Sequence, residues 1–126
     1  MMKLLTIPIL LITLMFSSTS YAEWTKLNKD VNGTTFYLDF ERIKKHDGYV
    51  YFWILNDYLK PLSGGSFSGK FYVQGDCKLF RMKTLSTSLY KEPMGKGTGE
   101  TFTPPDKWKY LPNSVLELVT KSLCNE

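Results

Sequence analysis

The chain has 126 residues, 43% of them apolar and 15% aromatic, and it carries 16 Lys and Arg against 12 Asp and Glu. This length allows one small domain and excludes a multidomain enzyme, and the apolar content excludes a disordered chain. The formal net charge of +4 comes without a long basic run, so charge alone does not indicate nucleic-acid binding.

Residues 1–22 predict a secretory signal peptide. After a positive start comes an apolar run of 13 residues, 4–16, and a small and polar stretch at 17–22 precedes an expected cleavage before Glu23. The alternative is a membrane anchor, but 13 apolar residues fall short of the ~20 that a spanning helix needs. We therefore expect an exported mature domain, residues 23–126, with no transmembrane segment after cleavage.

The first part of this domain predicts a β-hairpin followed by two turns. Residues 23–28 and 34–40 flank an Asn-Gly pair at 32–33, which favours the positive-φ positions that hairpin turns need. Residues 40–45 predict a single helical turn, and residues 46–48 predict a further turn that leads into the next strand.

Residues 49–57 (YVYFWILND) are the strongest predicted strand. Its alternate side chains are apolar or aromatic on both sides, so both faces of this strand need a cover. A C-terminal helix can cover one face. The other cover is a folded-over loop, a curled sheet or a second subunit, and the last of these would make the protein a homodimer.

The middle of the chain predicts two more strands and two irregular segments. A flexible connection at 59–68 precedes strands at 69–77 and 78–90. Residues 95–99 (GKGTG) resemble a phosphate-binding loop only in composition, so we interpret them as a turn. The prolines in residues 103–110 indicate an irregular aromatic segment.

The C-terminal residues predict a helix, because Ser114 and Glu117 have the spacing of a capping box. The helix should have one apolar stripe, and Cys124 lies away from it. A disulfide between Cys124 and Cys77 therefore requires the helix to end or bend near Leu123. The fold class is therefore α+β, with an antiparallel sheet of about five to six strands packed against this helix. The expected stripe consists of Val115, Leu118, Val119, Ser122 and Leu123.

The two cysteines, Cys77 and Cys124, predict a disulfide, because thiols outside the cytoplasm tend to oxidise. Closing a loop of about 48 residues contributes about 4 kcal/mol in the chain-entropy model. Zinc binding and redox catalysis are the alternatives. His46 is the only histidine and neither cysteine has a CxxC partner, so we expect no metal and no cofactor.

Catalytic groups are sparse, and we do not expect an enzyme. His46 sits in a charged turn, where an imidazole is usually solvated rather than a general base. Asp39 and Glu41 could pair as catalytic carboxylates, but the simpler interpretation is a helix cap and a surface ion pair.

The densest positive group surrounds Cys77 and is interleaved with aromatic residues. This composition is typical of single-strand nucleic-acid platforms, but export argues against such a partner. Acidic glycans, anionic lipid headgroups and acidic proteins are the remaining partners, and an ordinary solvated sheet face is the alternative. The candidate binding face consists of Lys70, Tyr72, Lys78, Arg81 and Lys83.

Several motifs together resemble the surface-adhesin protein E family: GTTFYLD at 33–39, YVYFWILNDYLKP at 49–61, DCK at 76–78, PMGKG at 93–97 and TPPDKW at 103–108. The resemblance implies an antiparallel sheet packed on a helix, a disulfide between the matching cysteines, and dimerisation. It also implies a Gram-negative source with a periplasmic or cell-surface location. For the member that names the family, it implies attachment to host matrix proteins such as vitronectin and laminin.

The chain departs from the naming adhesin in two features. No cysteine follows Ala22 as a lipid-attachment site, and Ser63 and Gly64 occupy the positions of a basic pair. We expect an exported, non-catalytic binding module, with adhesin-like recognition of a host matrix protein as the leading hypothesis. The alternative is a periplasmic accessory protein that binds an envelope partner through the apolar face of 49–57, and a small hydrolase is a third possibility.

Overall fold

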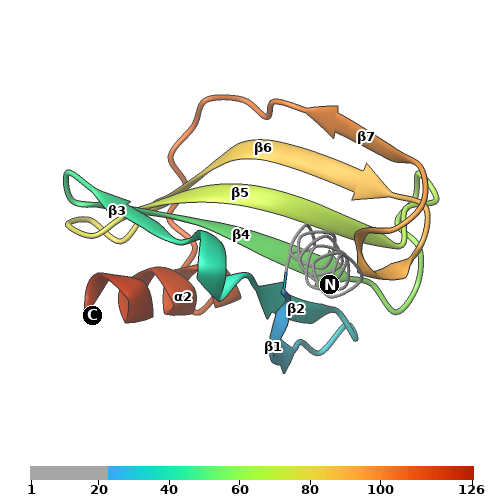
Figure 1. The fold of residues 1–126 in the computed structure, drawn as a ribbon, viewed down its shortest axis with the longest axis horizontal. Coiled ribbons are helices and arrows are strands. Elements are labelled where there is room, and N and C mark those ends of the chain that lie inside the picture. Colours follow the sequence, from blue (N-terminus) through green and yellow to red (C-terminus); the bar gives the residue numbers. More distant parts are fainter. Residues whose placement is uncertain (1–22) are drawn as a thin grey trace, which may run out of the picture.

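The computed structural model describes residues 23–126, which form an antiparallel sheet with a helix against one of its faces (Figure 1). This arrangement confirms the α+β class. The predicted signal peptide, residues 1–22, lies outside the described residues. Within 23–126, no helix has the length and apolar character that crossing a membrane requires.

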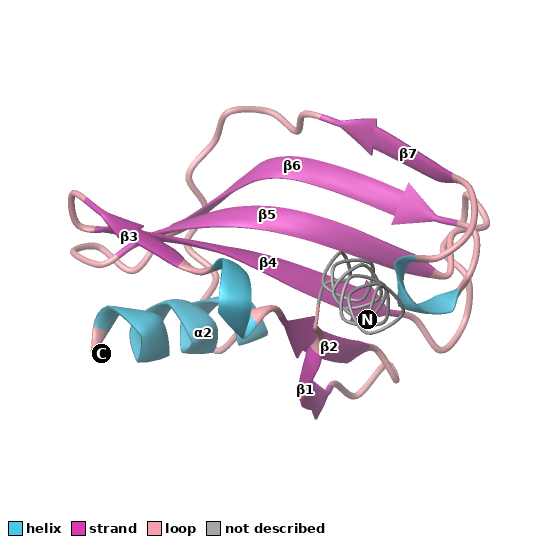
Figure 2. Cartoon of the chain, viewed as in Figure 1, coloured by secondary structure: helices cyan, strands magenta, loops and turns pink. Residues whose placement is uncertain are grey.

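Seven antiparallel strands make up the sheet, with β4, β5 and β6 as its long centre (Figure 2). The order is β1-β2-β4-β5-β6-β7, and β3 pairs with β4 beside this path. The strands are β1 (Thr25–Lys29), β2 (Thr35–Leu38), β3 (Lys44–His46), β4 (Tyr49–Asp57), β5 (Ser68–Asp76), β6 (Met82–Tyr90) and β7 (Gly99–Phe102).

The predicted N-terminal hairpin is confirmed as the β1–β2 pair. In its turn, Gly33 takes a φ of 84°, and an Asp30 carboxylate oxygen accepts hydrogen bonds from the N–H groups of Asn32 and Thr34 at 2.9 and 3.0 Å. The turn is therefore held by an aspartate side chain as well as by the glycine that the Asn-Gly pair predicted.

The predicted helical turn over 40–45 is too long. Only Phe40–Arg42 (η1) is helical, as a 3-10 turn, and Lys44–His46 belong to β3 instead. Asp47 and Gly48 both take a positive φ, which is the geometry of a two-residue hairpin turn. This turn folds β3 back onto β4, and backbone pairing then outweighs any local helical preference.

The predicted N-cap of the C-terminal helix, α2 (Val115–Cys124), is confirmed, whereas the Glu117 side chain bonds one residue before the position that a capping box requires. Ser114 Oγ accepts a hydrogen bond from the Glu117 N–H at 3.1 Å, and Glu117 Oε1 accepts one from the Asn113 N–H at 3.1 Å. The predicted helix begins where the sequence indicated, because the Ser114 hydroxyl satisfies an N–H group that the first turn leaves free, while the Glu117 carboxylate holds the residue that precedes the cap.

The predicted stripe of α2 is wrong at two positions. Leu118 is 57% exposed and Ser122 is also exposed, whereas Thr120 is fully buried. The helix is turned so that Thr120 faces Gly75 of β5, where the missing side chain leaves room for it. Cys124, one turn beyond Thr120, consequently lies toward the sheet, and the helix ends with it.

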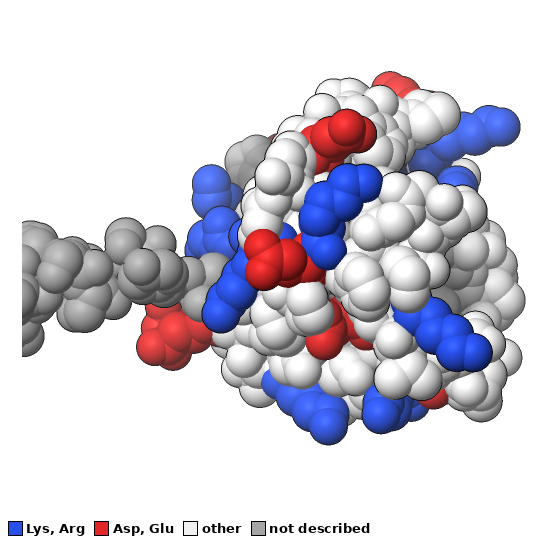
Figure 3. Space-filling view, turned by 90° about the vertical axis from the view of Figure 1, so that its right-hand side faces the viewer, with Lys and Arg blue, Asp and Glu red and all other residues white. Residues whose placement is uncertain are grey.

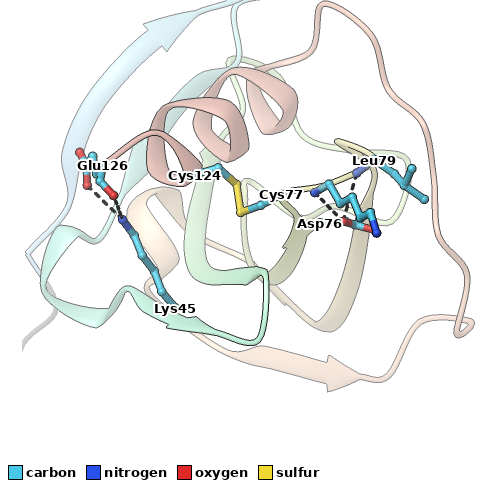
Figure 4. The surroundings of a disulfide bond; sticks show 7 residues. Lys45, Asp76, Cys77, Leu79, Cys124 and Glu126 are labelled. Atoms are coloured by element: carbon cyan, nitrogen blue, oxygen red, sulfur yellow. Dashed lines mark hydrogen bonds and ion pairs between the residues drawn. A yellow bond between two sulfur atoms is a disulfide. The ribbon is translucent and has the colours of Figure 1, made fainter.

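The core lies between α2 and the sheet, and the disulfide closes its edge. Buried side chains of β4, β5 and β6 meet the buried side chains of α2 there. Cys77, the residue after β5, is bonded to Cys124, which confirms the predicted bridge (Figure 4). Beside it, Lys45 Nζ of β3 donates a hydrogen bond to the Glu126 carbonyl oxygen at 3.1 Å.

Candidate binding face

The face of the sheet that points away from α2 is rich in aromatic residues. Side chains alternate along a strand. In β4, Val50, Phe52 and Ile54 are buried on the side that faces α2, so the residues between them point to the opposite side. We call this side the aromatic face and define it by Tyr49, Tyr51, Trp53, Tyr72 and Trp108.

The centre of the aromatic face is a row of stacked rings. Trp53 lies directly opposite Tyr72 in the β4–β5 register, with ring centroids 4.9 Å apart, and Tyr51 lies 6.3 Å from Tyr72. The Arg42 guanidinium lies 5.2 Å from the Trp53 ring centroid. Since Arg42 comes from η1 and Tyr72 from β5, on opposite sides of β4, Trp53 is held between them.

A second stack lies at the end of this face near the β5–β6 turn. Trp108 stacks on Tyr49 with centroids 5.8 Å apart and planes 18° from parallel. The charged groups of Arg81 and Lys83 lie 4.6 and 4.5 Å from the Trp108 ring centroid. These contacts bring the irregular segment that contains Trp108 over the sheet.

Loops, one of the three covers expected for this side of β4, lie over both ends of the aromatic face. At the end opposite Trp108, the 3-10 turn η2 (Pro93–Gly95) lies over the sheet. Its Met94 N–H donates a hydrogen bond to Asp57 Oδ1 at 3.0 Å, and its Gly95 N–H donates one to Ser68 Oγ at 2.8 Å. Between these two covers, Tyr51, Trp53 and Tyr72 stay partly exposed.

The cations beside the rings have carboxylate partners. The three cations that contact Trp53 and Trp108 are therefore neutralised locally. At the end of the molecule that Figure 3 faces, blue and red side chains are also interspersed rather than gathered into one basic patch. The pairs are Arg42 with Asp39 at 2.6 Å, Arg81 with Asp76 at 3.0 Å and Lys83 with Asp106 at 2.6 Å.

Asp76 organises the turn between β5 and β6, next to the disulfide (Figure 4). Its Oδ1 accepts hydrogen bonds from the N–H groups of Lys78 at 2.8 Å and Leu79 at 3.2 Å. Burial by itself would raise the pKa of Asp76, but these N–H groups and the Arg81 guanidinium outweigh burial and hold the pKa below its usual value. The ionised carboxylate thus fixes the position of Arg81 beside Trp108.

The candidate binding residues predicted from sequence are only partly brought together. Tyr72, Arg81 and Lys83 belong to the two stacks described above. Lys70 lies on the same side of β5 but toward η2, with its Nζ 4.9 Å from the Tyr90 ring centroid. Lys78 is exposed in the β5–β6 turn.

The candidate binding face predicted from sequence includes only Tyr72 of the aromatic face. The sequence did indicate an apolar face of 49–57 for the alternative function, and this signal could have added Tyr49, Tyr51 and Trp53 to the candidate site. No local pattern pointed to Trp108, because its segment is irregular and reaches the face only by pairing with the edge of β6.

The residues considered for catalysis make contacts with residues close to them in sequence. His46 is 75% exposed at the end of β3 and pairs with Asp47 at 3.0 Å. Asp39 caps η1 by accepting a hydrogen bond from the Glu41 N–H at 3.0 Å, which confirms the cap. The turn predicted at 95–99 is shorter, because Gly95 ends η2 and Gly99 begins β7, and its Gly97 takes a positive φ.

The chain resembles known proteins at the level of family and fold. The family model described as surface-adhesin protein E matches residues 24–125. The structure of crystal form II of Haemophilus influenzae protein E is 22% identical with a TM-score of 0.55, covering 81% of this chain and 87% of that one. The crystal structure of protein E from non-typeable Haemophilus influenzae is 20% identical with a TM-score of 0.52, covering 85% and 79%. None of the curated proteins compared matches this chain.

Proposed function

Because this chain belongs to the surface-adhesin protein E family, we propose that it is an exported, non-catalytic binding module that recognises a protein partner through the aromatic face. The description of the family as a surface adhesin supports adhesion and the cell surface as the location, and a host matrix protein is the partner that the sequence resemblance implies. The observation that carries the proposal is the partly exposed stack of Tyr51, Trp53 and Tyr72 between two loop covers.

The chemistry of this face suits a protein partner. Tyr, Trp and Arg are the residues that most often dominate binding energy at protein interfaces. Here Trp53 is already held between Arg42 and Tyr72, so little side-chain freedom is lost when a partner binds. The paired cations make a polyanionic ligand less suitable, because its charge would compete with Asp76 and Asp106.

The residues predicted from sequence keep a role in this proposal. Tyr72 supplies the centre of the interface, and Arg81 and Lys83 hold Trp108 at its edge. Lys70, which is half-buried, and Lys78, which is exposed, lie at the periphery, where charges influence the rate of association more than the affinity.

Binding to immobilised host extracellular-matrix proteins tests the proposal. Trp53→Ala and Tyr72→Ala should each weaken binding by about 30-fold, the effect expected for a central aromatic anchor. Tyr110→Ala is the matched control, because Tyr110 is an aromatic residue that is 67% exposed and lies outside the face. Unchanged affinity in both face variants, with circular dichroism showing the native fold, would overturn the proposal.

Location separates the adhesin from the alternative, a periplasmic accessory protein that binds an envelope partner through the same face. Protease treatment of intact cells should remove a surface-displayed protein and leave a periplasmic one. Complete protection in intact cells, together with digestion after the outer membrane is opened, would assign the periplasmic role.

A further inference from the structure

A groove of about 830 Å³ lies on the other side of the sheet, next to α2. Strands β5 and β6 form its floor, and its walls come from β7, from the chain that links β7 to α2 and from the start of α2. Figure 1 shows this connection passing around the end of the sheet. Its apolar lining includes Phe71, Met82, Leu89, Phe102, Leu111 and Leu116.

We propose that this groove binds a long-chain fatty acid, with the acyl chain along the apolar floor and the carboxylate at Lys107 and Lys109. The proposal is independent of the aromatic face, which lies on the opposite side of the sheet. It depends on the size of the groove, its apolar lining and the charges at one of its ends.

The dimensions of the groove suit one acyl chain. Its volume falls within the range of about 300–1,000 Å³ that is common for small-molecule sites. Along β6, the floor runs from Met82 to Leu89, which corresponds to about 23 Å of strand at ~3.3 Å per residue. A fatty acyl chain spans one leaflet, about 15 Å of a bilayer core, so it fits within this length. Phe102, at 49% exposure, leaves apolar surface that such a chain would cover.

The register of the chain places two lysines at one end of the groove. Met82 and Lys109 exchange both backbone hydrogen bonds, at 2.9 and 2.8 Å, so their side chains lie on the same side of the sheet. Trp108 consequently lies on the opposite side, in the aromatic face, and Lys107 returns to the groove.

Charges along the groove give it a direction. Within residues 23–126, neither Lys107 nor Lys109 has a carboxylate at ion-pair distance, whereas Asp106, which also lines the groove, is held by Lys83 at 2.6 Å. At the far end, Glu100 lies opposite Leu89 in the register. A fatty acid therefore places its carboxylate at the lysines and its methyl end toward Leu89.

Fluorescence titration with cis-parinaric acid, below its critical micelle concentration, tests the proposal on the mature protein. We expect saturable binding of one probe per chain and displacement by palmitate. The double variant Lys107→Gln/Lys109→Gln should bind the probe about fivefold more weakly, the loss expected for two exposed charge contacts. Hexadecanol, which has no charge, should displace the probe equally well from both proteins.

Two further variants make the outcome decisive. Lys26→Gln/Lys29→Gln removes the same charge from exposed positions of β1 outside the groove and should leave the affinity unchanged. Phe102→Asp, at an exposed edge position, should weaken both the probe and hexadecanol. Absence of saturable binding, equal affinity in the Lys107/Lys109 variant and the wild type, or displacement by an acidic amphipathic peptide but not by palmitate would each overturn the proposal.

Discussion

Thr120 of α2 lies against Gly75 of β5 so closely that a Cβ atom at position 75 would be 2.7 Å from both Thr120 Cγ2 and Thr120 Oγ1. Two residues after Gly75 comes Cys77, and one turn after Thr120 comes Cys124. The close approach of helix and strand and the disulfide therefore stabilise the same orientation of α2.

The first prediction concerns this contact. Gly75→Ala should lower the free energy of unfolding by about 2 kcal/mol, because the added methyl group overpacks a close helix–strand contact. Gly64→Ala is the matched control, since a Cβ there meets nothing within 4 Å, and it should change stability by less than about 0.5 kcal/mol. Urea unfolding measures both. Equal stability of the two variants would contradict the contact.

The buried hydroxyl of Thr120 gives a second prediction. Thr120 Oγ1 is buried without a hydrogen-bond partner, so it has lost water and gained no replacement. Thr120→Val keeps the shape and removes the polar atom, and it should raise the free energy of unfolding by about 1 kcal/mol. A loss of stability on chemical denaturation would show that the hydroxyl is satisfied in solution.

The third prediction concerns the bridge between Cys77 and Cys124, which are 47 residues apart in sequence. Replacing both with serine should lower the free energy of unfolding by about 4 kcal/mol, since the open chain regains entropy when unfolded. A reducing agent should destabilise the wild type by a comparable amount and leave the double variant unaffected. An effect of reductant on the variant would point to a cause other than the bridge.

The fourth prediction concerns pH and the carboxylate of Asp76. Its pKa in the folded protein lies below the unfolded value of about 3.9, so its contribution to stability is complete above that value. The contribution is lost as the pH falls from about 4 through the folded pKa. Asp76→Asn should cost about 2 kcal/mol near neutral pH, because charge-assisted hydrogen bonds are lost.

Unfolding midpoints at neutral pH and at pH values below 4 check the Asp76 prediction. The difference in stability between wild type and Asp76→Asn should shrink as the solution is acidified. A difference that stays constant over this range would mean that the pKa of Asp76 is the same in the folded and the unfolded protein. Asp47→Asn is the matched control, because Asp47 is exposed in the β3–β4 turn and should contribute little at any pH.

Short-range patterns in the sequence determined much of this fold. Alternation over 49–57 identified β4, the spacing of Ser114 and Glu117 identified the start of α2, and the isolated cysteine pair identified the disulfide. The strand and the helix start can be predicted from sequence because side-chain alternation and capping hydrogen bonds depend on residues that are close in sequence.

Only the tertiary structure decided which side of α2 faces the sheet and which aromatic residues form one surface. Because Gly75 has no side chain, Thr120 can pack against it, and this orientation of α2 leaves Leu118 exposed to solvent. Gly75 and Thr120 are far apart in sequence, so no local pattern predicts their contact. Trp108 reaches the aromatic face because Lys109 pairs with Met82, which no pattern within residues 103–110 indicates. Contacts between residues far apart in the chain depend on the register of the whole sheet, so they are settled only when the strands are in place.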